Sequence, residues 1–358
     1  MTSHRFPSPV GGVAFPSDFA PSVIFAILYG LLLPLMGYRI FNKKSRTMML
    51  FGCLSFGIER IVIFSLRALQ SHNATLRQSK GMNAYMQCTI GMGFIAICQD
   101  VVMLLRTALV NSTLPSAEPE VSYPMKEIPE SSRSSIVTLQ APEVVSDEED
   151  KARQRYWYRR LANLLFLGFL GSQVPGTVGN SDYANAVDRP SEATLVFRLR
   201  YVGSAIALLF SIALAVTAWW AATKVPRFKR NAAHLTLFVC ALFSITSIYR
   251  LCVMRTTTTS LISTASGSQN TPAEKAAFYI FHILPEYISV LILLSCNVRD
   301  VFGTGMFGDR RFRDETQREK EIKKTNELYQ LDKKAGSAVG IYDEEFRMFA
   351  RVRQLWRL

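Results

Sequence analysis

Charged residues are scarce over long stretches of this 358-residue chain, although its formal net charge is +13. The Lys and Arg residues lie mainly at the ends of apolar stretches and in the C-terminal tail. Anchoring at the cytoplasmic face of a membrane accounts for that placement better than nucleic acid, which we do not expect as a partner. The distribution is typical of a polytopic membrane protein.

Histidine is also scarce, and the four in the sequence are too dispersed for a zinc enzyme. His4 and His72 lie outside the apolar stretches, His234 near the inner end of the sixth stretch, and His282 in the outer half of the seventh. A zinc hydrolase in a membrane needs several ligands at one depth. We also find no nucleophile–base pair and no ATP site. We therefore expect neither an enzyme nor a cofactor.

The seventh apolar stretch, 276–297, lacks the lysine that a Schiff-base photoreceptor requires. The motifs of rhodopsin-class G-protein-coupled receptors are missing as well. The third stretch ends in DVVMLLRTAL instead of Asp/Glu-Arg-Tyr, and the seventh contains LPEYISVLIL instead of Asn-Pro-x-x-Tyr. Seven spans alone do not make a receptor, because one fold hosts many functions.

The six cysteines do not indicate a disulfide framework. Four of them, Cys53, Cys98, Cys240 and Cys296, lie inside apolar stretches or at their inner ends, while Cys88 and Cys252 lie towards the opposite side. Two interpretations remain open. One is a Cys88–Cys252 bridge, and the other is a set of buried thiols that pack as small hydrophobic groups.

Seven apolar stretches are present, each close to the roughly 20 residues that cross a hydrocarbon core of about 30 Å as a helix. They cover 21–41, 48–69, 84–109, 161–178, 195–222, 232–254 and 276–297. The sequence therefore predicts an all-α polytopic membrane protein, a seven-transmembrane helix bundle. The fourth stretch is the weakest, because glycines and Pro175 interrupt it. Without it the C-terminus would change sides.

The Lys and Arg residues also predict the orientation. The segments that flank the spans on one side of the membrane carry about twice as many Lys and Arg residues as those on the other side, which include Arg198, Arg200 and Lys275. Because positive charge favours the cytoplasmic side, we expect the N-terminus outside and the C-terminus in the cytoplasm. No cleaved signal peptide is expected. The predicted segments are an extracytoplasmic tail (1–20), three helices (21–110), a disordered cytoplasmic loop (111–158), four helices (159–298) and a basic cytoplasmic tail (299–358). We expect the membrane to be the plasma membrane or an endomembrane.

The last residues, EEFRMFARVRQLWRL, have the pattern of an amphipathic helix. Phe349 and Trp356 fall on an apolar face that basic residues such as Arg353 flank. Such a helix lies on a membrane surface and is attracted to anionic lipids. We expect these three residues to contact the inner leaflet.

Several polar residues lie within the predicted spans: Glu59, Arg60, Asp100, Tyr249, Arg250, His282 and Glu286. An ionised carboxylate near the bilayer centre costs on the order of several kcal/mol unless it is paired. Arg250, His282 and Glu286 fall within roughly two helical turns of a common depth. We predict an Arg250–Glu286 pair, with Arg60 as the alternative partner. The polar set either lines a ligand cavity or forms interhelical hydrogen bonds that contribute about 0.6 kcal/mol each.

Four segments of these spans resemble the fungal lipid-translocating exporter family, named for resistance to aminocholesterol. They read GIERIVIFSLRAL, FIAICQDVVMLLRTAL, ITSIYRLCV and FYIFHILPEYISVLILL. The family's recurring residues correspond by position to Glu59, to Arg60 or Arg67, to Tyr249-Arg250, and to Glu286. The chain departs from the family at Leu251-Cys-Val-Met, where a Glu is usual, and at His282, where an Asp is usual. It therefore resembles a divergent member.

The resemblance implies a role in lipid or xenobiotic stress. With the polar set it predicts a protein that binds or moves an amphipathic lipid or sterol-like compound through a polar cavity between helices. Transport would be facilitated, or driven by a gradient through Glu286 or His282. The alternative function is a heptahelical sensor whose cytoplasmic loop and tail engage a signalling partner.

Overall fold

The computed structural model describes residues 4–114 and 151–311 and, beyond them, only 313, 314, 318, 319, 322, 325, 326 and 329. Most of the predicted loop (111–158) and the predicted tail helix with Phe349, Arg353 and Trp356 lie outside the described residues. The chain divides into two units, Met1–Arg310 and Arg311–Leu358. The first unit carries the fold.

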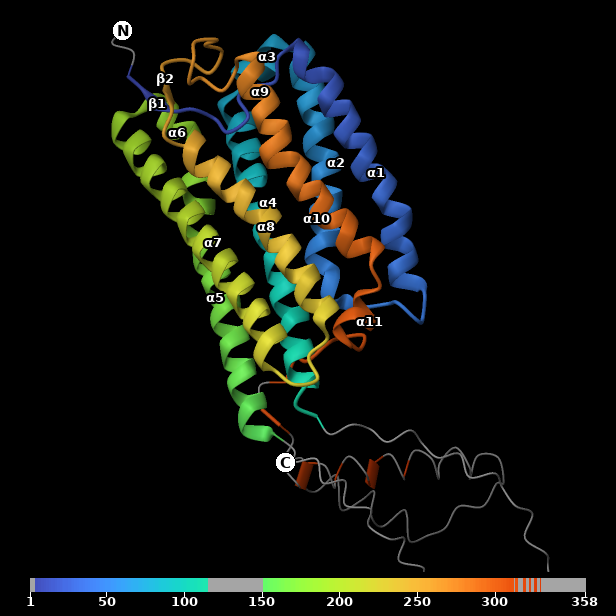
Figure 1. Cartoon of the computed structure of the whole chain (residues 1–358). Coiled ribbons are helices and arrows are strands. Elements are labelled where there is room, and N and C mark those ends of the chain that lie inside the picture. The colour runs from blue at the N-terminus through green and yellow to red at the C-terminus, as the bar shows by residue number, and fades with distance from the viewer. Residues whose placement is uncertain are drawn as a thin grey trace, which may run out of the picture. The chain divides into compact units, whose positions relative to one another are not determined.

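In the described part of the chain, seven helices are long and apolar enough to cross a membrane. Together they form the bundle in Figure 1. They are α1 (Phe19–Phe41, after η1, Pro16–Asp18), α2 (Phe51–His72, after η2, Met48–Leu50), α4 (Lys80–Asn111), α5 (Ala152–Ser181), α7 (Pro190–Lys224), α8 (Arg230–Val253), and a last helix made of α9 (Pro272–Phe278), η3 (Tyr279–Ile283) and α10 (Leu284–Ser295). The prediction of an all-α bundle of seven spans is confirmed. The chain is an integral, multi-pass membrane protein.

Short elements mark the two ends of the bundle. At the upper end in Figure 1 lie α3 (Ala74–Gln78), α6 (Tyr183–Asp188) and a ribbon in which β1 (Phe6–Pro7) pairs antiparallel with β2 (Thr257–Thr258). At the lower end lies α11 (Val298–Phe302). Because an odd number of helices alternates in direction, the N-terminal segment and α11 lie at opposite ends.

The fourth span, the weakest in the sequence, is a continuous helix of 30 residues. Three of its four glycines are close-packing positions, whereas a Cβ added at Gly171 would have no atom within 4 Å. An added Cβ would lie 2.1 Å from the Phe210 ring at Gly168 and 2.5 Å from Met92 Sδ at Gly176. Neighbouring helices therefore approach α5 closely, which is the usual role of small residues between membrane helices.

The N-terminal segment 6–14 is packed into the upper end of the bundle. Gln87 on α4 holds it at both backbone groups of Val10, accepting from the amide at 2.8 Å and donating to the carbonyl at 3.2 Å. The Tyr183 hydroxyl donates to the Pro7 carbonyl at 2.8 Å. Burial raises the pKa of that Tyr183 hydroxyl, so it stays a neutral donor. The segment therefore lies buried between the helices at the upper end of the bundle, where α4 and α6 hold it by hydrogen bonds.

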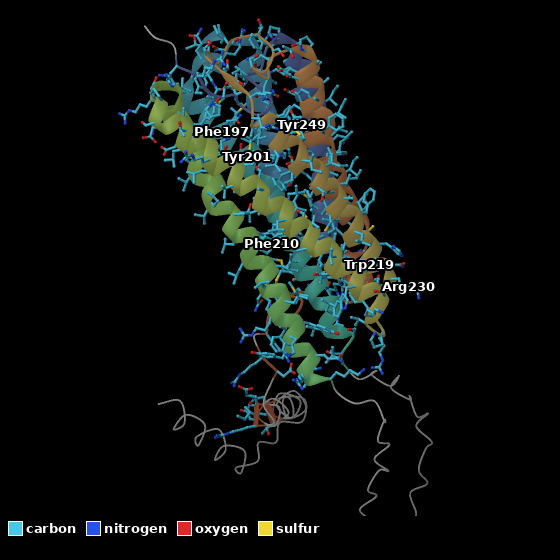
Figure 2. The ribbon with its side chains drawn as sticks, turned by 60° about the vertical axis from the view of Figure 1, so that its left-hand side comes forward. Phe197, Tyr201, Phe210, Trp219, Arg230 and Tyr249 are labelled. Atoms are coloured by element: carbon cyan, nitrogen blue, oxygen red, sulfur yellow. The ribbon has the colours of Figure 1, made fainter. Side chains whose placement is uncertain are left out.

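The seven helices differ in how much of their surface is buried, and their exposed aromatic residues are placed as expected for a protein in a bilayer. Helix α4 is central. In its most apolar 18-residue stretch 67% of the residues are buried, against 28% in the corresponding stretches of α1 and α5. Exposed aromatic residues lie towards both ends of the bundle, for example Tyr201 in the upper part of α7 and Trp219 in its lower part (Figure 2). Tyr and Trp favour the two membrane interfaces.

All six cysteines are free, so Cys88 and Cys252 form no bridge.

Candidate functional site

The centre of the polar network is an ion pair between Arg60 on α2 and Glu286 in the first turn of α10. Arg60 Nη2 lies 2.9 Å and Nε 3.2 Å from Glu286 Oε2, and both side chains are fully buried. The predicted Arg250–Glu286 pair is therefore wrong, and the alternative partner is the one that forms it. Arg250 and His282 both reach the Ile90 carbonyl, but a shared level along the bundle does not tell which face a side chain occupies.

Helix α4 leaves the space that this pair needs. A Cβ at Gly93 would lie 2.5 Å from the Phe56 ring and 2.9 Å from Arg60 Nη2. The Arg60 guanidinium stacks over Phe56 at 4.3 Å and donates to the Thr89 carbonyl at 3.3 Å. Its charge is thus balanced by one carboxylate, one carbonyl dipole and one aromatic face.

His282 lies on the other side of Glu286. Its Nε2 is 3.4 Å from Glu286 Oε1 and 3.3 Å from the Ile90 carbonyl, while its ring stacks on Phe278 and meets Tyr249 edge-on. His282 belongs to the π-helical η3, which ends at Ile283, two residues before Pro285. Widened turns of this kind are frequent at functional sites, and proline there cannot donate the backbone bond of a regular helix.

Three atoms of this network are buried without a hydrogen-bond partner among the described residues. They are Glu286 Oε1, His282 Nδ1 and the Tyr249 hydroxyl. A buried polar atom left without a partner costs about 1 to 3 kcal/mol. The site therefore has unused hydrogen-bonding capacity.

Three predicted site residues, Asp100, Glu59 and Arg250, are not part of this network. Asp100 accepts hydrogen bonds from the amides of Gly52 at 3.2 Å and Cys53 at 2.7 Å, at the start of α2. It satisfies two of the free amides at that helix end and complements its dipole. Glu59 is only half-buried and has no hydrogen bond or ion pair with a described residue.

Arg250 belongs to a second polar group, together with a residue that sequence reasoning missed. Arg250 Nε donates to Ser204 Oγ at 3.2 Å and its Nη1 to the Ile90 carbonyl at 3.4 Å. Arg200, counted in the sequence as a flanking charge, is buried, and its Nη2 donates to Gln87 Oε1 at 2.9 Å. Arg200 lies within both the predicted span 195–222 and α7, and its side chain is buried against the neighbouring helices.

A third group at the upper end was also missed. Asp18 pairs with Lys275 at 2.8 Å and with Arg67 at 3.4 Å, and it accepts from the Tyr279 hydroxyl at 3.2 Å. The Arg67 guanidinium also donates to the carbonyls of Gly11 and Gly12. Lys275 had the sequence signal of a flanking charge, whereas it is a buried contact of the N-terminal segment.

The open space beside these groups is small. Arg200 and Arg250 line a cavity of about 10 Å³ between α4, α5, α7 and α8. A larger hollow of about 280 Å³ lies at the upper end, lined by Phe6, Val187 and residues 259–262. The first holds about one water, so this cavity is too small for an amphipathic molecule in the arrangement of the described helices.

Comparisons with protein-family models, with curated proteins and with solved structures gave no match to this chain.

Proposed function

We propose that this protein binds an amphipathic lipid or sterol-like compound at the network of Arg60, His282 and Glu286, and moves it within the bilayer. The resemblance to lipid-translocating exporters supports this function, since Tyr249, Glu286 and either Arg60 or Arg67 are among the residues that it singles out. The protein lies in the plasma membrane or an endomembrane, with its N-terminus outside and its basic C-terminal tail facing anionic lipids of the inner leaflet.

The observation that carries the proposal is the unused hydrogen-bonding capacity beside Glu286. Glu286 Oε1, His282 Nδ1 and the Tyr249 hydroxyl are all buried without a hydrogen-bond partner among the described residues. Purely structural networks tend to satisfy such atoms, because each one left unpaired costs stability. A hydroxyl or amine on an otherwise apolar ligand would supply the missing partner.

Entry of the ligand requires α2 and α10 to separate. The Arg60–Glu286 pair, fully buried at 2.9 Å, holds these two helices together in the closed arrangement. A polar ligand group that binds Glu286 offsets the loss of that contact, so binding and opening are coupled. Gradient-driven movement would use protonation of Glu286 or His282, and facilitated movement would need no such step.

Tyr249→Phe separates a functional role from a structural one. The hydroxyl has no partner in the described part of the chain, so its removal leaves stability unchanged or slightly higher. If the hydroxyl binds ligand, uptake of a fluorescent sterol analogue falls by about tenfold, the equivalent of one hydrogen bond. The measurement is initial uptake by cells that express the full chain, compared with cells that lack it.

The matched control is Tyr201→Phe, which removes a hydroxyl from the exposed face of α7. Uptake by that variant should equal that of the wild type. Equal uptake by cells with and without the protein, accompanied by a G-protein response, would favour the sensor and overturn the proposal.

A further inference from the structure

Positive charge exceeds negative charge inside the upper half of the bundle. The Arg60 charge is matched by Glu286, whereas Arg67 and Lys275 share the single carboxylate of Asp18. Arg200 and Arg250 are 2% and 3% exposed, and neither has a carboxylate within ion-pair distance among the described residues. Unpaired charges at such burial are costly, so both guanidinium groups call for a counter-ion.

Both arginines reach the same cavity. It has a volume of about 10 Å³ and is also lined by Ser172, Ser204 and three glycines. Arg200 Nε is buried without a hydrogen-bond partner among the described residues. Arg250 Nη2 donates to no described residue, while its Nε and Nη1 contact Ser204 and Ile90. Each arginine thus keeps a donor that no described residue accepts, and both arginines line the same cavity.

Glycines create the room for this arrangement. A Cβ on Gly91 would lie 2.5 Å from Asn180 Nδ2 and 3.3 Å from Arg250 Nη2. A Cβ on Gly203 would lie 3.1 Å from the Gly176 amide nitrogen and the Ser172 carbonyl. Larger side chains would push apart the four helices that surround the cavity, so the sequence keeps the space small and closely bounded.

We propose that this cavity is a binding site for a monatomic anion of chloride size, held by Arg200 and Arg250. The charge of the site selects an anion, and its volume, about that of one water, excludes phosphate and lipid headgroups. Ser172 and Ser204 also line the cavity, but their hydroxyl groups donate to the Gly203 carbonyl and to Met254 Sδ, so the guanidinium groups supply the donors for the anion. The bound anion would join α4, α5, α7 and α8, and this role is independent of lipid binding at Glu286.

The test is thermal unfolding of the purified full chain in detergent, in sodium chloride or sodium gluconate at equal ionic strength. We expect a saturable rise in Tm with chloride but not with gluconate. Arg250→Gln should weaken the apparent chloride affinity by about tenfold or more, since one charged donor group is lost. Arg198→Gln, an exposed arginine two residues before Arg200 on α7, should retain the wild-type response.

A second measurement uses only the wild-type protein, so its result does not depend on whether a variant folds. Line broadening of the chloride NMR signal by the wild-type protein, reversed by bromide, would report a specific site. Equal Tm in both salts together with an unbroadened line would overturn the proposal. Stabilisation by phosphate without any by chloride would overturn the size assignment.

Discussion

Replacing Glu286 with leucine should lower the free energy of unfolding by about 3 to 5 kcal/mol, because it leaves the Arg60 guanidinium buried without its counter-ion. Arg60→Leu should cost a similar amount for the converse reason. The double variant should lose less than the sum of the two, since leucines fill the space without leaving a charge behind. Denaturant unfolding of the purified protein in detergent, followed by circular dichroism, measures all three.

Glu59→Leu is the matched control for this cycle. Glu59 precedes Arg60 on α2, but it is half-buried and has no hydrogen bond or ion pair with a described residue. Its replacement should change the free energy of unfolding by about 0.5 kcal/mol or less. Additive losses at positions 60 and 286 would show that the two side chains do not stabilise each other.

Asp18→Asn should have an effect of comparable size, about 3 to 5 kcal/mol, because two buried cations lose their shared carboxylate. Arg67 and Lys275 both pair with Asp18 and also donate to carbonyls of the N-terminal segment. We therefore expect segment 6–14 to leave its position. Limited proteolysis in detergent should cut this segment in the variant and spare it in the wild type.

Asp188→Asn gives the corresponding control at the surface. Asp188 pairs with Lys80, but the two side chains are 57% and 46% exposed, so this pair contributes about 0 to 1 kcal/mol. Neither stability nor proteolysis of the N-terminal segment should change measurably. Protection of segment 6–14 in the Asp18→Asn protein would contradict its anchoring by Asp18.

The fold was predictable because hydropathy over about 20 residues is a strong signal for helices in lipid. The helix boundaries were less predictable, since α7 begins at Pro190 and its first residues are polar, like those of a loop that flanks a span. Arg200 was counted with the flanking charges although it lies within the predicted span 195–222, and it is buried because its side chain reaches Gln87 on α4. Glycines on α5 suggested interruption, whereas tertiary packing against Phe210 and Met92 explains two of them.

The sequence identified which buried polar residues belong to the candidate site, but not which of them pair with one another. Charged residues within apolar stretches identified Arg60, Arg250, His282 and Glu286, because their burial is costly without a partner. Which partner each one meets depends on helix rotation and on small residues such as Gly93 on a third helix. The role of Asp100 was out of reach for the same reason, since it binds amides 47 and 48 residues away along the chain.

Photo-crosslinking with a sterol analogue on the purified full chain, mapped by mass spectrometry, shows whether the ligand binds inside the bundle beside Glu286. If the network around Glu286 binds the ligand, the label should fall on residues adjoining Arg60, Tyr249 and His282, and unlabelled sterol should compete for it. Label confined to exposed apolar residues such as Leu209 on α7, without competition, would contradict a binding site inside the bundle.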